Sequence, residues 1–152
     1  MGKELYEANP DAKEIFDKAN EILKFDLIKL CFEGPEDELT KSANAQAAIF
    51  THSIAALKVL EKTGMFTPKF ALGLSMGENT ALCASGVLSF EAGLNLVRKR
   101  GELMDMASKK NPGKMVSVLG MTVDEVEELC RGIGGCEIAN LNCPGQVVVS
   151  GK

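Results

Sequence analysis

The sequence has no tryptophan, a single histidine and no apolar run near the roughly 18 residues that a membrane-spanning helix needs. Its first residues, Met1-Gly2-Lys3-Glu4, are polar and do not resemble a secretory signal. Seventeen basic against twenty-one acidic residues give a net charge of −4, and no basic cluster stands out. This balance argues against nucleic acid or an anionic membrane as a partner. We therefore expect a soluble, cytoplasmic protein.

Cysteine pairs at metal-binding spacing are also missing. Five cysteines occur without a Cys-x-x-Cys pair, and His52 is the sole histidine. Structural zinc sites need four such ligands, usually arranged in pairs, so no zinc site is predicted. An odd number of unpaired cysteines is typical of reduced thiols in a cytosolic protein. We expect neither a metal nor a redox cofactor.

The chain does have the means to form a core. It contains 152 residues, of which 45% are hydrophobic and 25% charged, a size and composition typical of one ordinary domain. Asn9-Pro10 is a helix-start signal, and Gly64 is suited to end a helix in the left-handed conformation. Apolar spacing predicts helices over 10–24, 27–32, 43–63, 76–86 and 89–108, with one further turn over 36–39.

Only one strand, Lys69–Leu72, is predicted in the first hundred residues, where it leads into a glycine-rich turn. A lone strand lacks a hydrogen-bonding partner, and burial of its unpaired backbone groups is costly. We therefore expect its partner strands to lie outside these residues. The open strand edges also predict self-association of this polypeptide on its own.

The pattern changes after the breaker Asn111-Pro112-Gly113. A β-like run over 115–119 is followed by the capping box Thr122-x-x-Glu125 and its helix, and then by strands over 136–141 and 146–150. Asn142-Cys143-Pro144-Gly145 is a tight-turn sequence between these two strands. The order βαββ is the opening of a ferredoxin-like unit. We therefore divide the chain into residues 1–112, a helix-rich core, and 113–152, an incomplete ferredoxin-like subdomain.

The strongest chemical signal is Gly73-Leu74-Ser75-Met76-Gly77, between the predicted strand and the next helix. A nucleophilic serine on such a sharp turn needs small neighbours, and the first amides of the following helix can stabilise an oxyanion. The motif alone is also compatible with a plain glycine turn. Its position favours a nucleophile at Ser75.

Several segments together resemble the malonyl-CoA:acyl-carrier-protein transacylases and the acyltransferase domains of polyketide and fatty acid synthases. The resemblance extends in collinear order over residues 2–151. Its motifs are Gly73–Glu78, Ala84–Ser89, Arg98–Met104, Gly34–Thr40, Gln46–Ala48 and Asn140–Val148. It implies an α/β fold, with part of an α/β-hydrolase-like acyltransferase core.

The resemblance also implies an activity. Members transfer malonyl from CoA to acyl carrier protein in fatty acid biosynthesis, through a malonyl-serine intermediate. Ser75 matches the nucleophile, Met76 the residue whose amide serves the oxyanion hole, and Arg100 the arginine that binds the malonyl carboxylate. A planar guanidinium can hold a carboxylate with two hydrogen bonds, which suits that role.

Three features depart from the family pattern. Leu74 stands where a histidine is usual. The loop that supplies the second oxyanion amide is expected before Met1, and the catalytic histidine is expected beyond Lys152. His52 is interpreted as a packed helix residue rather than a displaced base, so we expect residues 1–152 alone to be inactive.

The remaining candidates have plainer interpretations. Arg98 is expected to be solvated and Met104 to fill the core. Gln46 could face the site, although helix packing is the role we expect. Cys83 is interpreted as a small buried residue. Asn140 and Asn142 either line the acyl pocket, as the resemblance implies, or shape the turn between the strands.

Two other functions stay open. One is a serine acyltransferase or hydrolase for another acyl group, against which a buried Arg100 would argue. The other is a non-catalytic module that binds a carrier protein or a subunit, which the absence of the family's histidine favours.

Overall fold

The chain divides into two compact units, Met1–Met106 and Ala107–Lys152. The computed structural model describes residues 1–64 and 68–152. The boundary falls near the end of the last helix of the first unit, shortly before the Asn111-Pro112-Gly113 breaker. Each unit has its own core.

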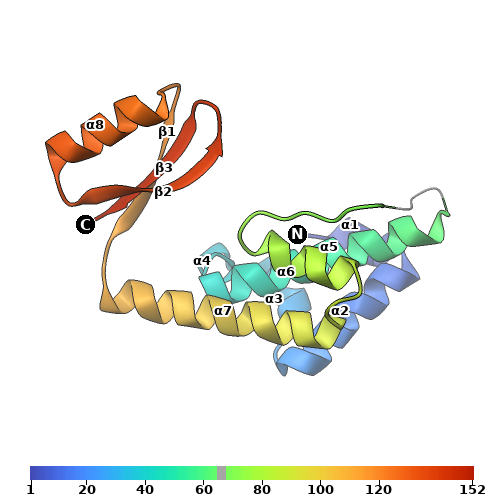
Figure 1. The fold of residues 1–152 in the computed structure, drawn as a ribbon. Coiled ribbons are helices and arrows are strands. Elements are labelled where there is room, and N and C mark those ends of the chain that lie inside the picture. Colours follow the sequence, from blue (N-terminus) through green and yellow to red (C-terminus); the bar gives the residue numbers. More distant parts are fainter. Residues whose placement is uncertain (65–67) are drawn as a thin grey trace. The chain divides into compact units, whose positions relative to one another are not determined.

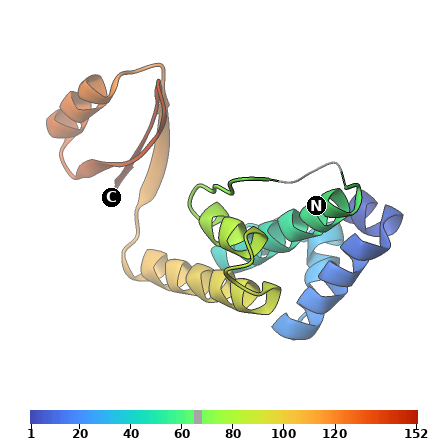
Figure 2. The same cartoon turned by 45° about the vertical axis from the view of Figure 1, so that its right-hand side comes forward.

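The first unit is built from helices (Figures 1 and 2). They are α1 (Lys3–Ala8), α2 (Pro10–Leu23), α3 (Leu27–Glu33), α4 (Glu36–Leu39), α5 (Ser42–Lys62), α6 (Gly77–Ala84) and α7 (Phe90–Lys110). The helices predicted from apolar spacing all form, and Gly64 has the expected positive φ of 67°. Helix α1 escaped prediction because it has six residues, no buried side chain and no side-chain cap.

The core of this unit lies between α2, α3, α5 and α7. Its largest fully buried side chains include Phe16, Phe50, Leu27, Ile54 and Leu94. Helix α7 approaches α5 very closely at two glycines. A Cβ added to Gly93 would lie 2.6 Å from the Phe50 ring, and one added to Gly101 would lie 2.4 Å from the Ala43 Cα.

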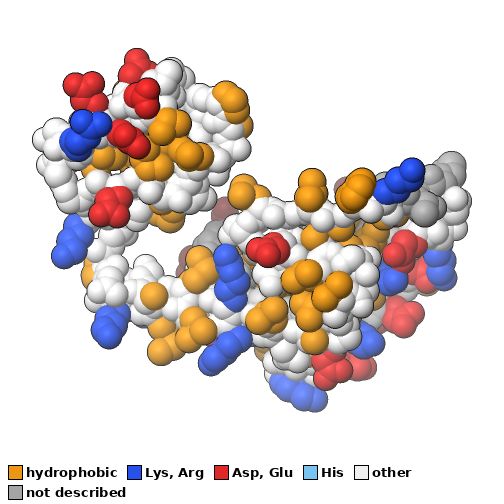
Figure 3. Space-filling model, in the orientation of Figure 1, with side chains coloured by type: hydrophobic (Ala, Val, Ile, Leu, Met, Phe, Trp, Pro, Cys, Tyr) orange, Lys and Arg blue, Asp and Glu red, His pale blue; other side chains and the backbone are white. Residues whose placement is uncertain are grey.

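The strand predicted over Lys69–Leu72 is not formed, so that prediction was wrong. The segment is extended and runs back along α5 without pairing, because the described residues of the first unit contain no strand to pair with it (Figures 1 and 2). Its alternate side chains Phe70, Leu72 and Leu74 are 86%, 93% and 72% exposed. Figure 3 shows hydrophobic side chains standing out along it.

The second unit contains β1 (Lys114–Leu119), α8 (Val123–Ile133), β2 (Cys136–Cys143) and β3 (Gln146–Gly151), which confirms the predicted βαββ order. Its three strands are antiparallel in the order β1-β3-β2. Both halves of the predicted capping box are present at the start of α8. Val126, Cys130 and Val147 are buried in its small core. No described helix of either unit is long and apolar enough to cross a membrane.

Candidate active site

Ser75 lies at the tip of the turn that joins the extended segment to α6. Its φ of 54° is in the left-handed region, where a non-glycine residue is uncommon and strained. Gly73 lets the chain fold back on itself, since a Cβ there would come within 2.0 Å of the Gly77 carbonyl. The Ser75 side chain is exposed. A nucleophile elbow needs such a sharp turn before a helix, but the segment that precedes it is not a strand here, so the elbow itself stays a prediction.

Helix α6 begins two residues after Ser75, with Met76 as its N-cap residue. The Gly77 N–H donates to the Leu74 carbonyl at 2.9 Å, and the Glu78 N–H donates to the Ser75 carbonyl at 3.3 Å. The Met76 N–H has no hydrogen-bond acceptor among the residues that the structure describes. Unpaired amides at a helix N-terminus carry partial positive charge and can receive a developing oxyanion. Met76 has the position its predicted role needs, and the role itself stays a prediction.

Arg100 on α7 reaches across to the serine. One guanidinium nitrogen, Nη2, donates to Ser75 Oγ at 3.0 Å. The other, Nη1, donates to the Gln46 side-chain carbonyl at 2.6 Å and lies 3.3 Å from the Met104 sulfur. No carboxylate pairs with this arginine among the described residues. Its charge is thus available to an anion beside Ser75.

Gln46 and Met104 take part in this arrangement. Gln46 therefore faces the site, the alternative to the helix packing that we expected, and the expectation that Met104 fills the core was wrong. Gln46 is 7% exposed, and its amide nitrogen lies 3.2 Å from the Met104 sulfur while its carbonyl holds Arg100. Met104 is 45% exposed rather than part of the core. A polar residue in the alanine-rich stretch of α5 was the available signal, because a buried amide needs partners.

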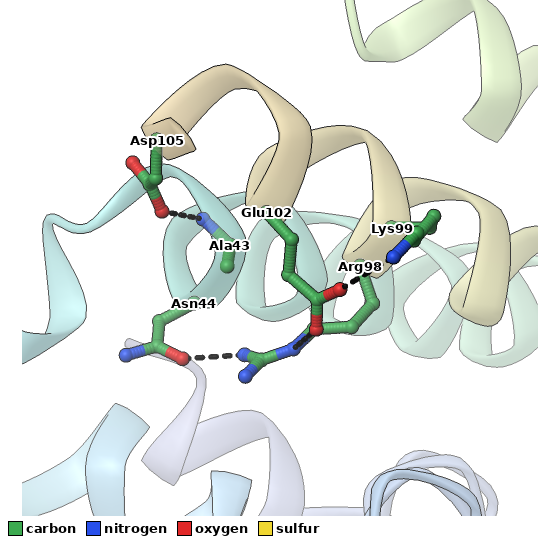
Figure 4. Close-up of polar contacts among 6 residues, drawn as sticks. All are labelled: Ala43, Asn44, Arg98, Lys99, Glu102 and Asp105. Carbon is green, nitrogen blue, oxygen red and sulfur yellow. Dashed lines mark hydrogen bonds and ion pairs between the residues drawn. The ribbon is translucent and has the colours of Figure 1, made fainter. Parts of the chain in front are cut away.

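Arg98 was expected to be solvated, and that expectation was wrong as well. Its guanidinium donates to Asn44 at 2.5 Å and to Glu102 at 3.3 Å (Figure 4). It also lies over the Phe25 ring at 4.9 Å. Arg98 and Arg100 are two residues apart on one helix and therefore point about 160° apart around its axis. One ties α7 to its neighbours, and the other faces Ser75.

The other predicted candidates lie elsewhere. His52 is on α5 next to Gly2, where an added Cβ would lie 2.8 Å from its ring, so it is a packed helix residue. Burial raises the pKa of the Cys83 thiol above its ordinary value, which makes Cys83 a poor nucleophile. Asn140 and Asn142 are on β2 in the second unit, and the register of β2 shifts next to each of them. Their place in an acyl pocket stays a prediction.

Comparison with known protein families identifies the family of this chain. The acyl transferase domain family matches residues 1–152, the whole chain. The chain belongs to this family. The resemblance to the transacylases is thereby confirmed, and so is the α/β class, since solved transacylases superpose closely on this chain.

Several relatives of this chain are named as transacylases or S-malonyltransferases that act on acyl carrier protein. The malonyl CoA-acyl carrier protein transacylase of Bacillus subtilis is 46% identical over 155 aligned residues, which cover 99% of the chain and 49% of that protein. The crystal structure of the transacylase from Clostridium perfringens is 42% identical, with a TM-score of 0.88 over 99% of the chain and 48% of its own length. The acyltransferase chain thus spans about half the length of the relatives it matches.

A third similar structure contains a partner protein of the relative. A malonyl-transacylase solved in complex with its type II PKS acyl-carrier protein is 33% identical, with a TM-score of 0.90 over 99% of this chain and 50% of that one.

Proposed function

We propose that the protein containing this chain transfers a malonyl group from CoA to acyl carrier protein through a malonyl-Ser75 ester. The observation that carries the proposal is the 3.0 Å hydrogen bond from Arg100 to Ser75. It brings together a strained, exposed hydroxyl and a guanidinium with no carboxylate partner among the described residues. The names of the relatives agree with this chemistry.

The reaction proceeds in two balanced steps. A general base takes the Ser75 proton, Oγ attacks the malonyl thioester carbonyl, and the C–S bond breaks as CoA leaves and regains a proton. The carrier protein's thiol then attacks the serine ester, and Oγ leaves with a proton returned to it. In both steps the Met76 N–H donates to the carbonyl oxygen as it becomes negative.

The general base comes from outside residues 1–152. A serine at its ordinary pKa is a weak nucleophile, and His52 is six residues beyond Gln46 and so about 120° around α5 from it. Its packing beside Gly2 supports the same inference. We therefore expect the 152-residue polypeptide on its own to show no turnover.

Arg100 supplies the acyl selectivity in this proposal. The malonyl carboxylate takes the place of Ser75 Oγ at Nη2 once the serine is acylated, and Gln46 keeps Nη1 fixed throughout. An acetyl group offers no carboxylate to the guanidinium. A hydrolase or transferase for neutral acyl chains would gain nothing from this cation.

The proposed chemistry needs no cofactor beyond the CoA thioester that carries the acyl group. The carrier-protein complex of a related malonyl-transacylase supports acyl carrier protein as the acceptor. Fatty acid biosynthesis in the cytoplasm is the setting we propose for it.

The experiment is acylation with radiolabelled malonyl-CoA in the full-length protein, followed by digestion and identification of the labelled residue. We expect the label on Ser75 and none on a Ser75→Ala variant that keeps its folded circular dichroism spectrum. Label on another residue would reject the nucleophile. Absence of any label from a protein that still binds the carrier protein would favour a non-catalytic binding module instead.

We further propose that the 152-residue polypeptide associates with itself through its exposed extended segment. Phe70, Leu72 and Leu74 present a row of apolar side chains at alternating positions, as an unpaired strand does. Sedimentation of this polypeptide and of a Leu72→Lys variant tests the proposal. We expect the unaltered polypeptide to sediment as an assembly of several copies and the variant as a species of lower mass.

A further inference from the structure

Helix α5 begins without a cap of its own. Its N-cap residue is Lys41, which makes no side-chain hydrogen bond to the first turn. The first four N–H groups of a helix have no partners within it, and a carboxylate is the group best suited to receive them. The first N–H groups of α5 therefore need a hydrogen-bond acceptor from another part of the chain.

Asp105 on α7 supplies this acceptor. Its Oδ1 accepts from the Ser42 N–H at 3.1 Å, and its Oδ2 accepts from the Ala43 N–H at 3.0 Å. Both carboxylate oxygens are thus used by two successive amides of the neighbouring helix, which lies more than sixty residues away in the sequence. Figure 4 shows Asp105 directed at the start of α5.

The same interface carries the proposed substrate arginine. Gly101 presses its backbone against Ala43, Arg98 bonds Asn44, and Arg100 bonds Gln46. These contacts hold the stretch of α7 from Arg98 to Asp105 against the first turns of α5. Asp105 is the last of them, and it fixes both the rotation of α7 and its position along the α5 axis.

We propose that Asp105 is a positioning residue for acyl selectivity, which holds α7 in the register that places the Arg100 guanidinium beside Ser75. This inference rests on the proposed function. Without the carboxylate, two amides lose their acceptor and the first turn of α5 frays. In an α-helix the Gln46 N–H donates to the Ser42 carbonyl, so the fraying reaches the residue that holds Arg100.

The test compares malonyl and acetyl transfer by the full-length protein and its Asp105→Ala and Asp105→Asn variants. Misplacement of a binding group by about 1 Å can cost up to about a hundredfold. We expect Asp105→Ala to lower the malonyl-to-acetyl ratio of kcat/KM about tenfold. Asp105→Asn keeps one acceptor and should fall between it and the unaltered protein. Glu91→Gln removes an exposed acidic charge in the first turn of the same helix and should leave the ratio unchanged.

A second arm separates positioning from a general loss of structure. In an Arg100→Ala background, Asp105→Ala should not change the ratio further, because the group it positions is gone. Amide hydrogen exchange gives a readout besides activity, and the Ser42 and Ala43 amides should exchange faster in Asp105→Ala.

Three results would overturn the inference. Equal slowing of malonyl and acetyl transfer by Asp105→Ala would make Asp105 merely structural. A further drop of the ratio in the Arg100→Ala background would show that it does not act through Arg100. Unaltered protein that transfers no malonyl would reject the proposed function itself, and this inference with it.

Discussion

Replacement of Arg100 by alanine gives the sharpest test of how the site selects its acyl group. The guanidinium contacts Ser75 Oγ at 3.0 Å and the Gln46 carbonyl at 2.6 Å, so it is fixed before any substrate arrives. A hydrogen bond to a charged group contributes about 1.5–3 kcal/mol. At about 1.4 kcal/mol per tenfold change in rate, malonyl transfer should fall roughly 10- to 140-fold. Acetyl transfer should change little.

The variant also has a structural cost that the assay must separate. Loss of Arg100 leaves the carbonyl of Gln46, a residue only 7% exposed, without its donor, which costs about 1–3 kcal/mol of stability. The paired variant Arg100→Met with Gln46→Leu removes both polar partners and should recover most of that stability without recovering malonyl transfer. Arg100→Lys keeps the charge but not the forked geometry, so it should lie between alanine and arginine.

The assay is transfer of radiolabelled malonyl or acetyl from CoA to acyl carrier protein by the full-length protein. The ratio of the two kcat/KM values does not depend on the fraction of active protein. An equal loss for both acyl groups would refute the reasoning, because it would make Arg100 a support for the turn rather than a carboxylate anchor.

Two further predictions concern stability. Gly101→Ala places a Cβ 2.4 Å from the Ala43 backbone, which cannot give way as a side chain can, so urea unfolding should show a loss of about 1–3 kcal/mol. Gly132→Ala in α8 is the control, since a Cβ there meets nothing within 4 Å, and a loss at Gly132 equal to that at Gly101 would contradict the packing argument. In the capping box, hydrogen bonds from the Thr122 backbone and side chain hold the pKa of Glu125 below its ordinary value. The stability from this pair should therefore be present at neutral pH and be lost as the pH falls below the ordinary range of a glutamic acid. Thr122→Val should flatten that dependence in a urea series between pH 7 and pH 3, and an unchanged slope would show that the box does not set it.

The sequence predicted the local features of this fold well, because their causes are local. The capping box at Thr122 and Glu125 needs only residues three apart in the sequence. The helix of 21 residues that begins at Ser42 is predicted from the spacing of its apolar residues. The strand that we expected over Lys69–Leu72 does not form, because the cause of a strand is not local. A strand needs a neighbour, and the described residues of the first unit offer none.

The site shows the same division. The turn at Ser75 follows from its glycines, whereas the roles of Arg98 and Gln46 depend on how α7 faces α5. Two arginines on one helix look alike in the sequence, and the packing of α7 on α5, which includes the close approach of Gly101 to Ala43, decides which of them points to Ser75. Asp105 could not be found from the sequence, since its two amide partners are contributed by a distant helix.

The irregular register of β2 affects which edge of the sheet in the second unit can pair with a further strand. The sheet order β1-β3-β2 leaves β1 and β2 as the outer strands among the described residues. β2 shifts register twice against β3, between Ile138 and Asn140 and between Leu141 and Cys143. An incoming strand needs an evenly spaced row of N–H and C=O groups, and such shifts interrupt that row. β1 pairs with β3 without a shift from Lys114 to Leu119, so it presents the regular template. A fourth strand, from the same polypeptide or another, would therefore add at β1, while β2 resists the edge-to-edge stacking from which fibrils grow.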